Sequence, residues 1–202
     1  MAKITSRAKQ AEITKNKIYE CGVKLIRKHG FDQVTVEQIA KEAGVSVGTY
    51  YYYFASKYEL FREIFKRADD YFVTDVAGQL KADDCKGQIV EYFEKYVDLN
   101  YADGIEMIKK LYTSENKMFL TKGRAMQTIL QSIIEEWQVK AQIPKHKSAA
   151  EITRMLFIVA RGVVFDWCLH DGETDLKNEM KNIISNMVDG SMKTFSATIE
   201  SP

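Results

Sequence analysis

The sequence is poor in the residues that interrupt helices and in those that build disulfide or metal sites. Among its 202 residues there are two prolines, three cysteines and three histidines. Because Pro144 and Pro202 are far apart, helices can run long, and no strand-like alternation of apolar and polar residues competes with them. Cys21, Cys85 and Cys168 are odd in number, widely separated and without histidine at ligand spacing. This pattern indicates neither a disulfide framework nor a metal site.

The sequence also lacks a long apolar run. Residues 155–170, MLFIVARGVVFDWCLH, are apolar around nearly the whole helix circumference, but Arg161 and Asp166 interrupt them. The run is shorter than the roughly 18 to 20 apolar residues that a membrane span needs. The first residues, MAKITSRAKQ, contain no apolar signal core, and no P-loop or paired-glycine nucleotide fingerprint occurs. We therefore expect a cytoplasmic protein that stays off membranes and has no cofactor.

Residues 35–61 contain two short helical patterns that a tight turn joins. Thr35 and Gln38 form a capping box that starts the first helix. Gly44 supplies the positive φ of a helix stop, and Ser46 is a good N-cap for a second helix ending near residue 53. So short a turn makes the helices cross steeply. The pattern predicts a helix-turn-helix.

The second of these helices suits the major groove of DNA. Small residues at its start let the helix N-terminus enter the groove, and tyrosine hydroxyls near its end can donate to phosphate oxygens. A Ser56–Glu59 capping box places Lys57 in the first turn of the next helix, where a cation opposes the helix dipole unless an anion lies opposite. The alternative interpretation is an aromatic core wedge of four tyrosines and an ordinary solvated Lys57.

The spacing of residues over 35–60 follows a family signature. The positions that carry it are Thr35, Ile39, Ala40, Ala43, Gly44, Val45, Ser46, Gly48, Tyr51, Phe54, Lys57 and Leu60. With these residues the segment resembles the TetR family of bacterial transcriptional repressors. One departure is Tyr50, where the family usually has Leu or another aliphatic residue, although tyrosine can occupy the same packing slot.

The resemblance implies a set of DNA contacts. Backbone phosphates would be contacted by Thr35, Tyr51, Tyr53 and Lys57, and base edges would be faced by Ser46, Val47, Gly48, Thr49 and Tyr50. The helix has no Arg, Asn or Gln, so no bidentate contact to guanine or adenine is expected. We expect specificity from Thr49, Tyr50, the Val47 methyl groups and DNA shape.

Charge divides the chain in the same way. Residues 1–67 hold 13 Lys and Arg against 7 Asp and Glu, whereas the remainder holds 16 against 21. A near-neutral total therefore hides a basic N-terminal part, as suits a domain that meets DNA. We expect an all-α fold, with a three-helix DNA-binding domain over residues 1–55 and a helical ligand-binding and dimerisation domain over residues 56–202. Helices are predicted at 56–80, 85–101, 103–114, 123–140, 148–170 and 175–197.

The apolar segment 155–170 must be buried on more than one side. With the final helix, where Met180, Ile183, Ile184, Met187 and Val188 form a stripe, it can build a four-helix interface across a twofold axis. TetR-like proteins dimerise through their last two long helices. A homodimer of this kind would present two reading helices about one DNA turn apart, roughly 34 Å, to a palindromic operator of double-stranded DNA.

Aromatic and methionine side chains are concentrated between residues 70 and 170, as in an ordinary core or an apolar ligand pocket. The resemblance favours a pocket for a small effector, apolar or aromatic. Its candidate residues are Tyr96, Tyr112, Phe119, Met126, Trp137, Arg161 and Phe165. Arg161 and Asp166 would orient a polar end of the ligand or make ion pairs, including pairs across the dimer.

The function that follows is a ligand-responsive regulator, by default a repressor that its ligand releases from DNA, although activators share the fold. Two other classes compete with it. One is a helical carrier that no longer binds DNA, but Tyr51 and Lys57 are retained. The other is an enzyme that would use Asp166, Cys168, His170 and Asp171, or Glu135 and Glu136. Because no third catalytic partner is evident, we do not expect an enzyme.

Overall fold

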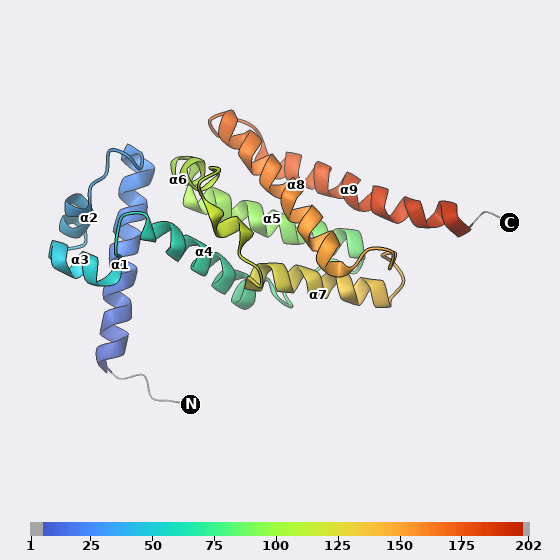
Figure 1. The fold of residues 1–202 in the computed structure, drawn as a ribbon, viewed down its shortest axis with the longest axis horizontal. Coiled ribbons are helices and arrows are strands. Elements are labelled where there is room, and N and C mark those ends of the chain that lie inside the picture. The colour runs from blue at the N-terminus through green and yellow to red at the C-terminus, as the bar shows by residue number, and fades with distance from the viewer. Residues whose placement is uncertain (1–5, 200–202) are drawn as a thin grey trace. The chain divides into compact units, whose positions relative to one another are not determined.

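The computed structural model describes the backbone of residues 6–199 and the side chains of residues 6–190. Within those ranges the chain forms helices joined by turns and loops, and no strand, so the all-α prediction is confirmed (Figure 1). The elements are α1 (Ser6–His29), α2 (Val36–Glu42), α3 (Val47–Tyr53), α4 (Glu59–Tyr71), the π-helix η1 (Phe72–Val76), α5 (Cys85–Asp103), α6 (Ile105–Leu111), the 3₁₀-helix η2 (Lys117–Leu120), α7 (Ala125–Val139), α8 (Ala149–Leu169) and α9 (Leu176–Ile199).

The chain packs as two compact units. The head unit comprises the chain up to Lys66 together with Asp103–Met118, and the body unit comprises Arg67–Ala102 and the chain from Phe119 onward. The chain passes from the head unit to the body unit inside α4. The packing boundary between Lys66 and Arg67 does not test the predicted functional boundary between residues 55 and 56, which stays a prediction.

The head unit packs around apolar faces of its helices. Its buried side chains include Ile18, Val23, Ile26, Ile39, Ala40, Tyr50, Phe54, Leu60 and Ile64. Gly22 lies where α1 approaches the start of α4, because a Cβ at this position would stand 2.9 Å from Leu60 Cδ1. Helix α6 joins the same unit through an ion pair of 2.6 Å between Lys110 and Asp32.

Helix α4 is shorter than the sequence predicts. The predicted helix over residues 56–80 begins at Glu59 and ends at Tyr71, where the wider η1 takes over. The Ala77 amide donates to the Phe72 carbonyl at 2.8 Å, and Gly78, with φ of 71°, then turns the chain away. A π-turn followed by a left-handed glycine cannot be read from apolar spacing. The five later helices lie close to their predicted ranges.

The body unit has an aromatic core. Phe72, Tyr92, Phe93, Tyr96 and Phe157 form one cluster, with ring centroids 4.7 Å apart for Phe72 and Tyr92 and 5.6 Å apart for Phe93 and Phe157. The buried Tyr92 hydroxyl donates to the Met126 carbonyl at 2.5 Å. A tyrosine can be buried at little cost in free energy when its hydroxyl makes a hydrogen bond.

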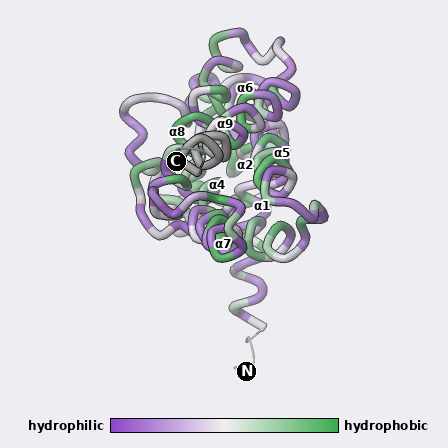
Figure 2. The backbone as a smooth tube through the Cα atoms, turned by 90° about the vertical axis from the view of Figure 1, so that its right-hand side faces the viewer, coloured by the Kyte–Doolittle hydropathy of each residue, from purple (hydrophilic) through white to green (hydrophobic). Residues whose placement is uncertain are grey.

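Two ion pairs attach α9 to α5 in the body unit. Lys86 lies 2.7 Å from Asp189, and Lys177 lies 3.3 Å from Asp98. Figure 2 shows hydrophobic and hydrophilic residues alternating along the helices, as expected when each helix buries one face. None of the described helices combines the length and the apolar character that a membrane crossing needs.

Candidate nucleic-acid interface

Both helices of the helix-turn-helix start with the caps that the sequence predicts. The Thr35 hydroxyl accepts from the Gln38 amide at 3.2 Å, and the Gln38 side chain returns the bond to the Thr35 amide at 2.8 Å. Ser46 Oγ accepts from the Thr49 amide at 3.0 Å. Gly44, with φ of 65°, forms the turn between them. The capping prediction is confirmed for both helices.

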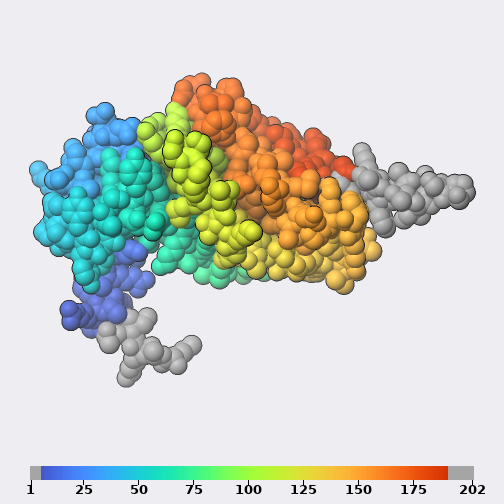
Figure 3. All heavy atoms as spheres, in the orientation of Figure 1, coloured from blue at the N-terminus to red at the C-terminus, as the bar shows by residue number. Residues whose placement is uncertain are grey.

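Helix α3 presents its N-terminal end to solvent. Ser46, Val47 and Gly48 are exposed and Thr49 is half-buried, so these four predicted reading residues share an accessible end of the helix. Figures 1 and 3 show α3 at the surface of the head unit. Free backbone N–H groups at a helix N-terminus favour nearby anions. The arrangement is therefore suited to approach by DNA phosphates and groove edges.

Tyr50 does not lie where the sequence predicts. Its side chain has no exposed surface, its ring packs 5.7 Å from that of Phe54, and its hydroxyl donates to the Ser56 carbonyl at 3.3 Å. Burial also raises the pKa of the Tyr50 phenol well above its ordinary value. The prediction that Tyr50 faces base edges is wrong, because the side chain fills the packing slot that an aliphatic residue usually takes.

The tyrosines that follow Tyr50 divide between surface and interior. Tyr51 is 50% exposed and Tyr52 is 81% exposed, whereas Tyr53 is half-buried. Tyr52 is an exposed residue of α3 that the sequence prediction omits. The spacing carries this signal, since residues 50, 53 and 54 fall on one helix face and residues 51 and 52 on the other.

Lys57 is engaged inside the head unit. Its ammonium donates to the carbonyls of Phe31 and Val34 at 2.5 and 2.7 Å and lies 4.1 Å from the centre of the Phe31 ring. Burial lowers the pKa of Lys57 below its ordinary value. The residue lies in the turn before α4, and it fixes the loop that precedes Thr35. Its predicted phosphate contact stays a prediction, but its observed role is internal.

The predicted ligand residues do not form one pocket. Tyr96, Met126 and Trp137 are buried in the core of the body unit, Tyr112 belongs to the head unit, and Phe165 is 47% exposed.

Two of the predicted ligand residues, Arg161 and Phe119, do lie together. Arg161 donates to the Phe119 carbonyl at 3.1 Å, and its guanidinium lies 5.7 Å from the Phe119 ring centre. This bond ties η2 to α8, so in the structure Arg161 positions a loop.

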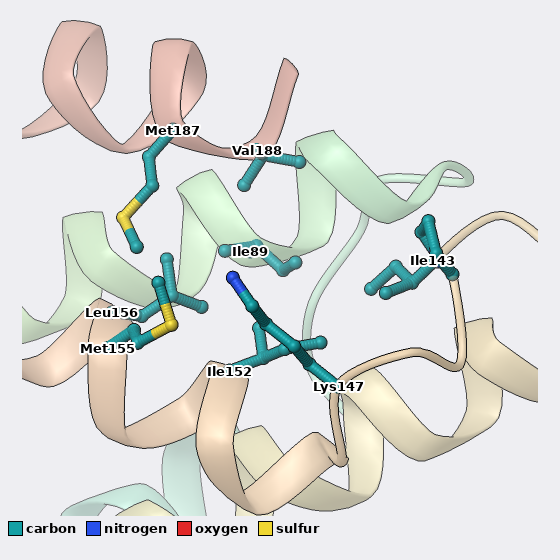
Figure 4. A pocket seen from close by; sticks show the side chains of 9 residues that line it. Ile89, Ile143, Lys147, Ile152, Met155, Leu156, Met187 and Val188 are labelled. Carbon is teal, nitrogen blue, oxygen red and sulfur yellow. The ribbon is translucent and has the colours of Figure 1, made fainter. Parts of the chain in front are cut away.

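An apolar pocket opens elsewhere in the body unit, between α5, α8, α9 and the loop that joins α7 to α8 (Figure 4). It is lined by Ile89, Ile143, Pro144, Lys147, Ile152, Met155, Leu156, Met187 and Val188. Its volume is about 30 Å³, well below the roughly 300 to 1,000 Å³ that is typical of small-molecule pockets. Sequence reasoning missed this pocket, because residues that are neighbours in it come from four separate segments.

The residues considered for catalysis do not assemble into a site. His170 Nδ1 lies 3.0 Å from the Asp166 carbonyl and 3.4 Å from its carboxylate, at the exposed end of α8. Cys168 is buried, and burial raises the pKa of the Cys85 thiol to about 12. Among the residues that the structure describes, no group of three His, Cys, Asp or Glu side chains is placed to hold a metal ion.

Fold and site together define a helix-turn-helix DNA-binding domain followed by a helical domain that has an apolar pocket. Residues 18–64, which contain α2, α3 and the turn between them, match the family model for bacterial regulatory proteins of the tetR family. This segment is therefore similar to the DNA-binding domain of TetR-family regulators.

Similarity to known proteins extends beyond this domain. The fatty acid metabolism regulator protein of Bacillus subtilis (strain 168) is 23% identical over 180 residues, which cover 86% of this chain and 93% of the relative. The fatty acid degradation regulator FadR of Bacillus halodurans superposes with a TM-score of 0.67 at 22% identity, covering 87% of this chain and 94% of the other. FadR of Bacillus subtilis in complex with stearoyl-CoA superposes with a TM-score of 0.62 at 20% identity, covering 86% of this chain and 96% of the other. These solved structures share the fold.

Proposed function

We propose that this protein is a ligand-responsive transcriptional regulator, most simply a repressor, that binds a palindromic operator as a homodimer. The observation that carries the proposal is the exposed N-terminal end of α3, capped by Ser46, inside a segment that matches TetR-family regulators. Exposed Tyr51 and Tyr52 extend this surface with hydroxyl donors for phosphate oxygens. The protein acts on double-stranded DNA in the cytoplasm.

The dimer surface that we propose runs along α8. Ile158, Phe165 and Leu169 are 44%, 47% and 64% exposed, and with the exposed Gly162 they follow a helical spacing of four, three and four residues. A Cβ at Gly162 would meet no atom within 4 Å, so a second helix can approach closely there. Ile183 on α9 is 42% exposed and adds to the apolar surface. Exposed apolar side chains in one stripe are typical of a helix pair that a partner covers.

Helix α4 is the element that we propose couples ligand to DNA. Leu60 and Ile64 in its first half are buried in the head unit. In its last turn, Asp69 lies 3.0 Å from Arg124 and accepts from the Met126 amide at 3.2 Å, both within the body unit. A movement of α7 in response to ligand would therefore be passed to the last turn of α4, and DNA affinity would change reciprocally with ligand affinity.

The effector that we propose is a long-chain acyl compound. Support comes from the apolar lining of the pocket, from the similarity to the fatty acid metabolism regulator protein, and from the structural neighbour FadR of Bacillus subtilis, which was solved in complex with stearoyl-CoA. A pocket lined by isoleucine and methionine suits an alkyl chain better than a planar polar ligand.

The test of DNA binding is a mobility-shift titration of the purified protein on the intergenic DNA beside its own gene, at several salt concentrations. We expect specific retardation that weakens as salt rises, because phosphate contacts release counterions. Tyr51→Phe and Tyr52→Phe should weaken binding severalfold, whereas Tyr101→Phe, a matched change at an exposed body tyrosine, should leave it unchanged. Equal affinity for this DNA and for unrelated DNA would reject the proposal and favour the carrier.

A further inference from the structure

The loop between α7 and α8 is held in place at the edge of the apolar pocket. The Gln138 side-chain amide is buried and donates to the carbonyls of Pro144 and Lys147 at 3.0 and 2.8 Å. Ile143 and Pro144 thereby become part of the pocket lining. The same two bonds fix the backbone from which the Lys147 side chain projects.

Lys147 places a cation on this apolar pocket. Figure 4 shows its side chain extending past Ile152, with the nitrogen directed toward Ile89 on α5 and the two α9 side chains. Within the described part of the chain, the Lys147 ammonium makes no hydrogen bond or ion pair. A lysine that lies along apolar surface with its charge unpaired is favourable for an incoming anion.

The acidic groups on neighbouring elements already have partners. Glu151, the first acid after the loop, accepts from the Ser148 hydroxyl at 2.7 Å, and Asp189 on α9 pairs with Lys86 at 2.7 Å. Residues 139–150 contain three lysines and one histidine and neither Asp nor Glu. Of the described residues that line the pocket, Lys147 is the one charged residue, and the others are apolar.

We propose that this pocket binds an anionic amphiphile, with the alkyl chain between Ile89, Met155 and Met187 and the anionic head on Lys147. The proposal rests on the proposed ligand response and deepens it by assigning the site and the group that meets the head. Carboxylate and phosphate would both satisfy the ammonium, so a free fatty acid and an acyl-CoA share the required chemistry.

Entry of the chain requires side chains to move, because the pocket is only about 30 Å³ in this structure. Met155, Met187 and the Lys147 stem are unbranched and can change rotamer at low cost. As the Lys147 stem leaves the pocket, its ammonium reaches the rim where the head group lies. Because α8 and α9 supply both pocket walls and the proposed dimer surface, occupancy is linked to the spacing of the two DNA-reading helices.

The experiment is calorimetric titration of the full-length protein, without DNA, by myristate, myristoyl-CoA and CoA. Lys147→Ala removes the cation, and Met155→Trp fills the pocket. Met187→Phe is the second filling variant if Met155→Trp fails to fold by circular dichroism. Lys122→Ala is the matched control, since Lys122 is an exposed body lysine outside the loop. We expect wild type to bind at least one acyl probe more tightly than CoA, Lys147→Ala to weaken it about tenfold, and Met155→Trp to abolish it.

The outcomes separate the sources of the anion. If Lys147→Ala weakens the binding of myristoyl-CoA alone, Lys147 contacts phosphate. If it weakens the binding of myristate alone, Lys147 contacts carboxylate. If it weakens the binding of both, either anion can occupy the same contact. The proposal would be overturned if acyl binding were the same in wild type, in Lys147→Ala and in a folded filling variant. It would also be overturned if wild type bound no acyl probe. If acyl binding fails while operator binding is intact, the pocket proposal is rejected and the proposed regulator function is retained. If acyl probes bind while operator DNA does not, the regulator function alone is rejected.

Discussion

Neighbouring tyrosines on α3 differ in what surrounds them. Tyr50 has no exposed surface and Tyr51 is half exposed, although the two residues are adjacent in the chain. Their rings lie 5.7 Å apart and nearly perpendicular. The first hydroxyl is therefore part of the fold, and the second is free to meet DNA.

Removing each hydroxyl should separate stability from DNA binding. Tyr50→Phe removes one of two donors to the Ser56 carbonyl, which keeps its bond from the Glu59 amide, and we expect a loss of about 1 kcal/mol in the free energy of unfolding. Tyr51→Phe should change stability little and weaken operator binding. Urea unfolding and mobility shift on the same preparations measure both quantities. A Tyr51→Phe protein that is destabilised but binds DNA normally would contradict the assignment.

Lys57 offers a choice between a structural role and a phosphate contact. Its ammonium satisfies two carbonyls of the loop before α2. We expect Lys57→Met to lower the free energy of unfolding by about 1 to 3 kcal/mol, because buried carbonyls lose a charged donor. Thermal unfolding monitored by circular dichroism measures this. If stability is unchanged while the slope of log K against log salt concentration for DNA binding falls by the equivalent of about one phosphate contact, Lys57 contacts DNA instead.

At the scale of the element, α3 is short and depends on its cap. It has seven residues, and isolated helices of this length are not stable in water. Ser46 Oγ accepts from the Thr49 amide and lies 2.8 Å from the Thr49 hydroxyl. We expect Ser46→Ala to cost about 1 kcal/mol, whereas Ser46→Asp keeps the cap and should hold stability. Urea unfolding of both variants provides the comparison, and equal stability of Ser46→Ala and wild type would show that the cap is not needed.

The proposed homodimer can be tested by changes on helix α8. Its inner face, with Val164 and Trp167, is buried in the body unit, while Phe165 and Leu169 are exposed. We expect the double change Phe165→Glu and Leu169→Glu to give folded monomers with weak operator binding, because like charges would meet across the twofold axis. Sedimentation velocity reports the mass. Val139→Glu, at a 78% exposed position on α7, is the control that should stay dimeric.

The elements were more predictable than the pocket, for a physical reason. Caps, the Gly44 turn and apolar spacing act over a few residues, so the positions of α2, α3 and the long helices follow from local sequence. The burial of Tyr50 is consistent with the same periodicity, since residues 50, 53 and 54 share one helix face. Pocket residues such as Ile89 and Met187 meet only through tertiary packing, which no local pattern contains.

At the scale of the whole molecule, the surplus of positive charge in residues 1–67 is only partly neutralised inside the fold. Lys24 pairs with Glu42 at 2.9 Å and Lys15 with Glu63 at 2.5 Å. The Lys24–Glu42 pair is exposed, so it contributes little stability and can rearrange when DNA approaches, whereas Glu63 of the other pair is buried. We therefore attribute the DNA affinity of the head unit to its charge and the choice of sequence to the exposed end of α3.

We infer that this protein links a DNA site to the binding of an anionic amphiphile. The most direct measurement is the affinity of the homodimer for its operator, by fluorescence anisotropy, as a function of myristoyl-CoA concentration. We predict that the operator Kd rises about tenfold or more and then saturates, and that operator DNA weakens acyl binding by the same factor, as linkage requires. An operator Kd that stays constant while the pocket is saturated with ligand would contradict the claim.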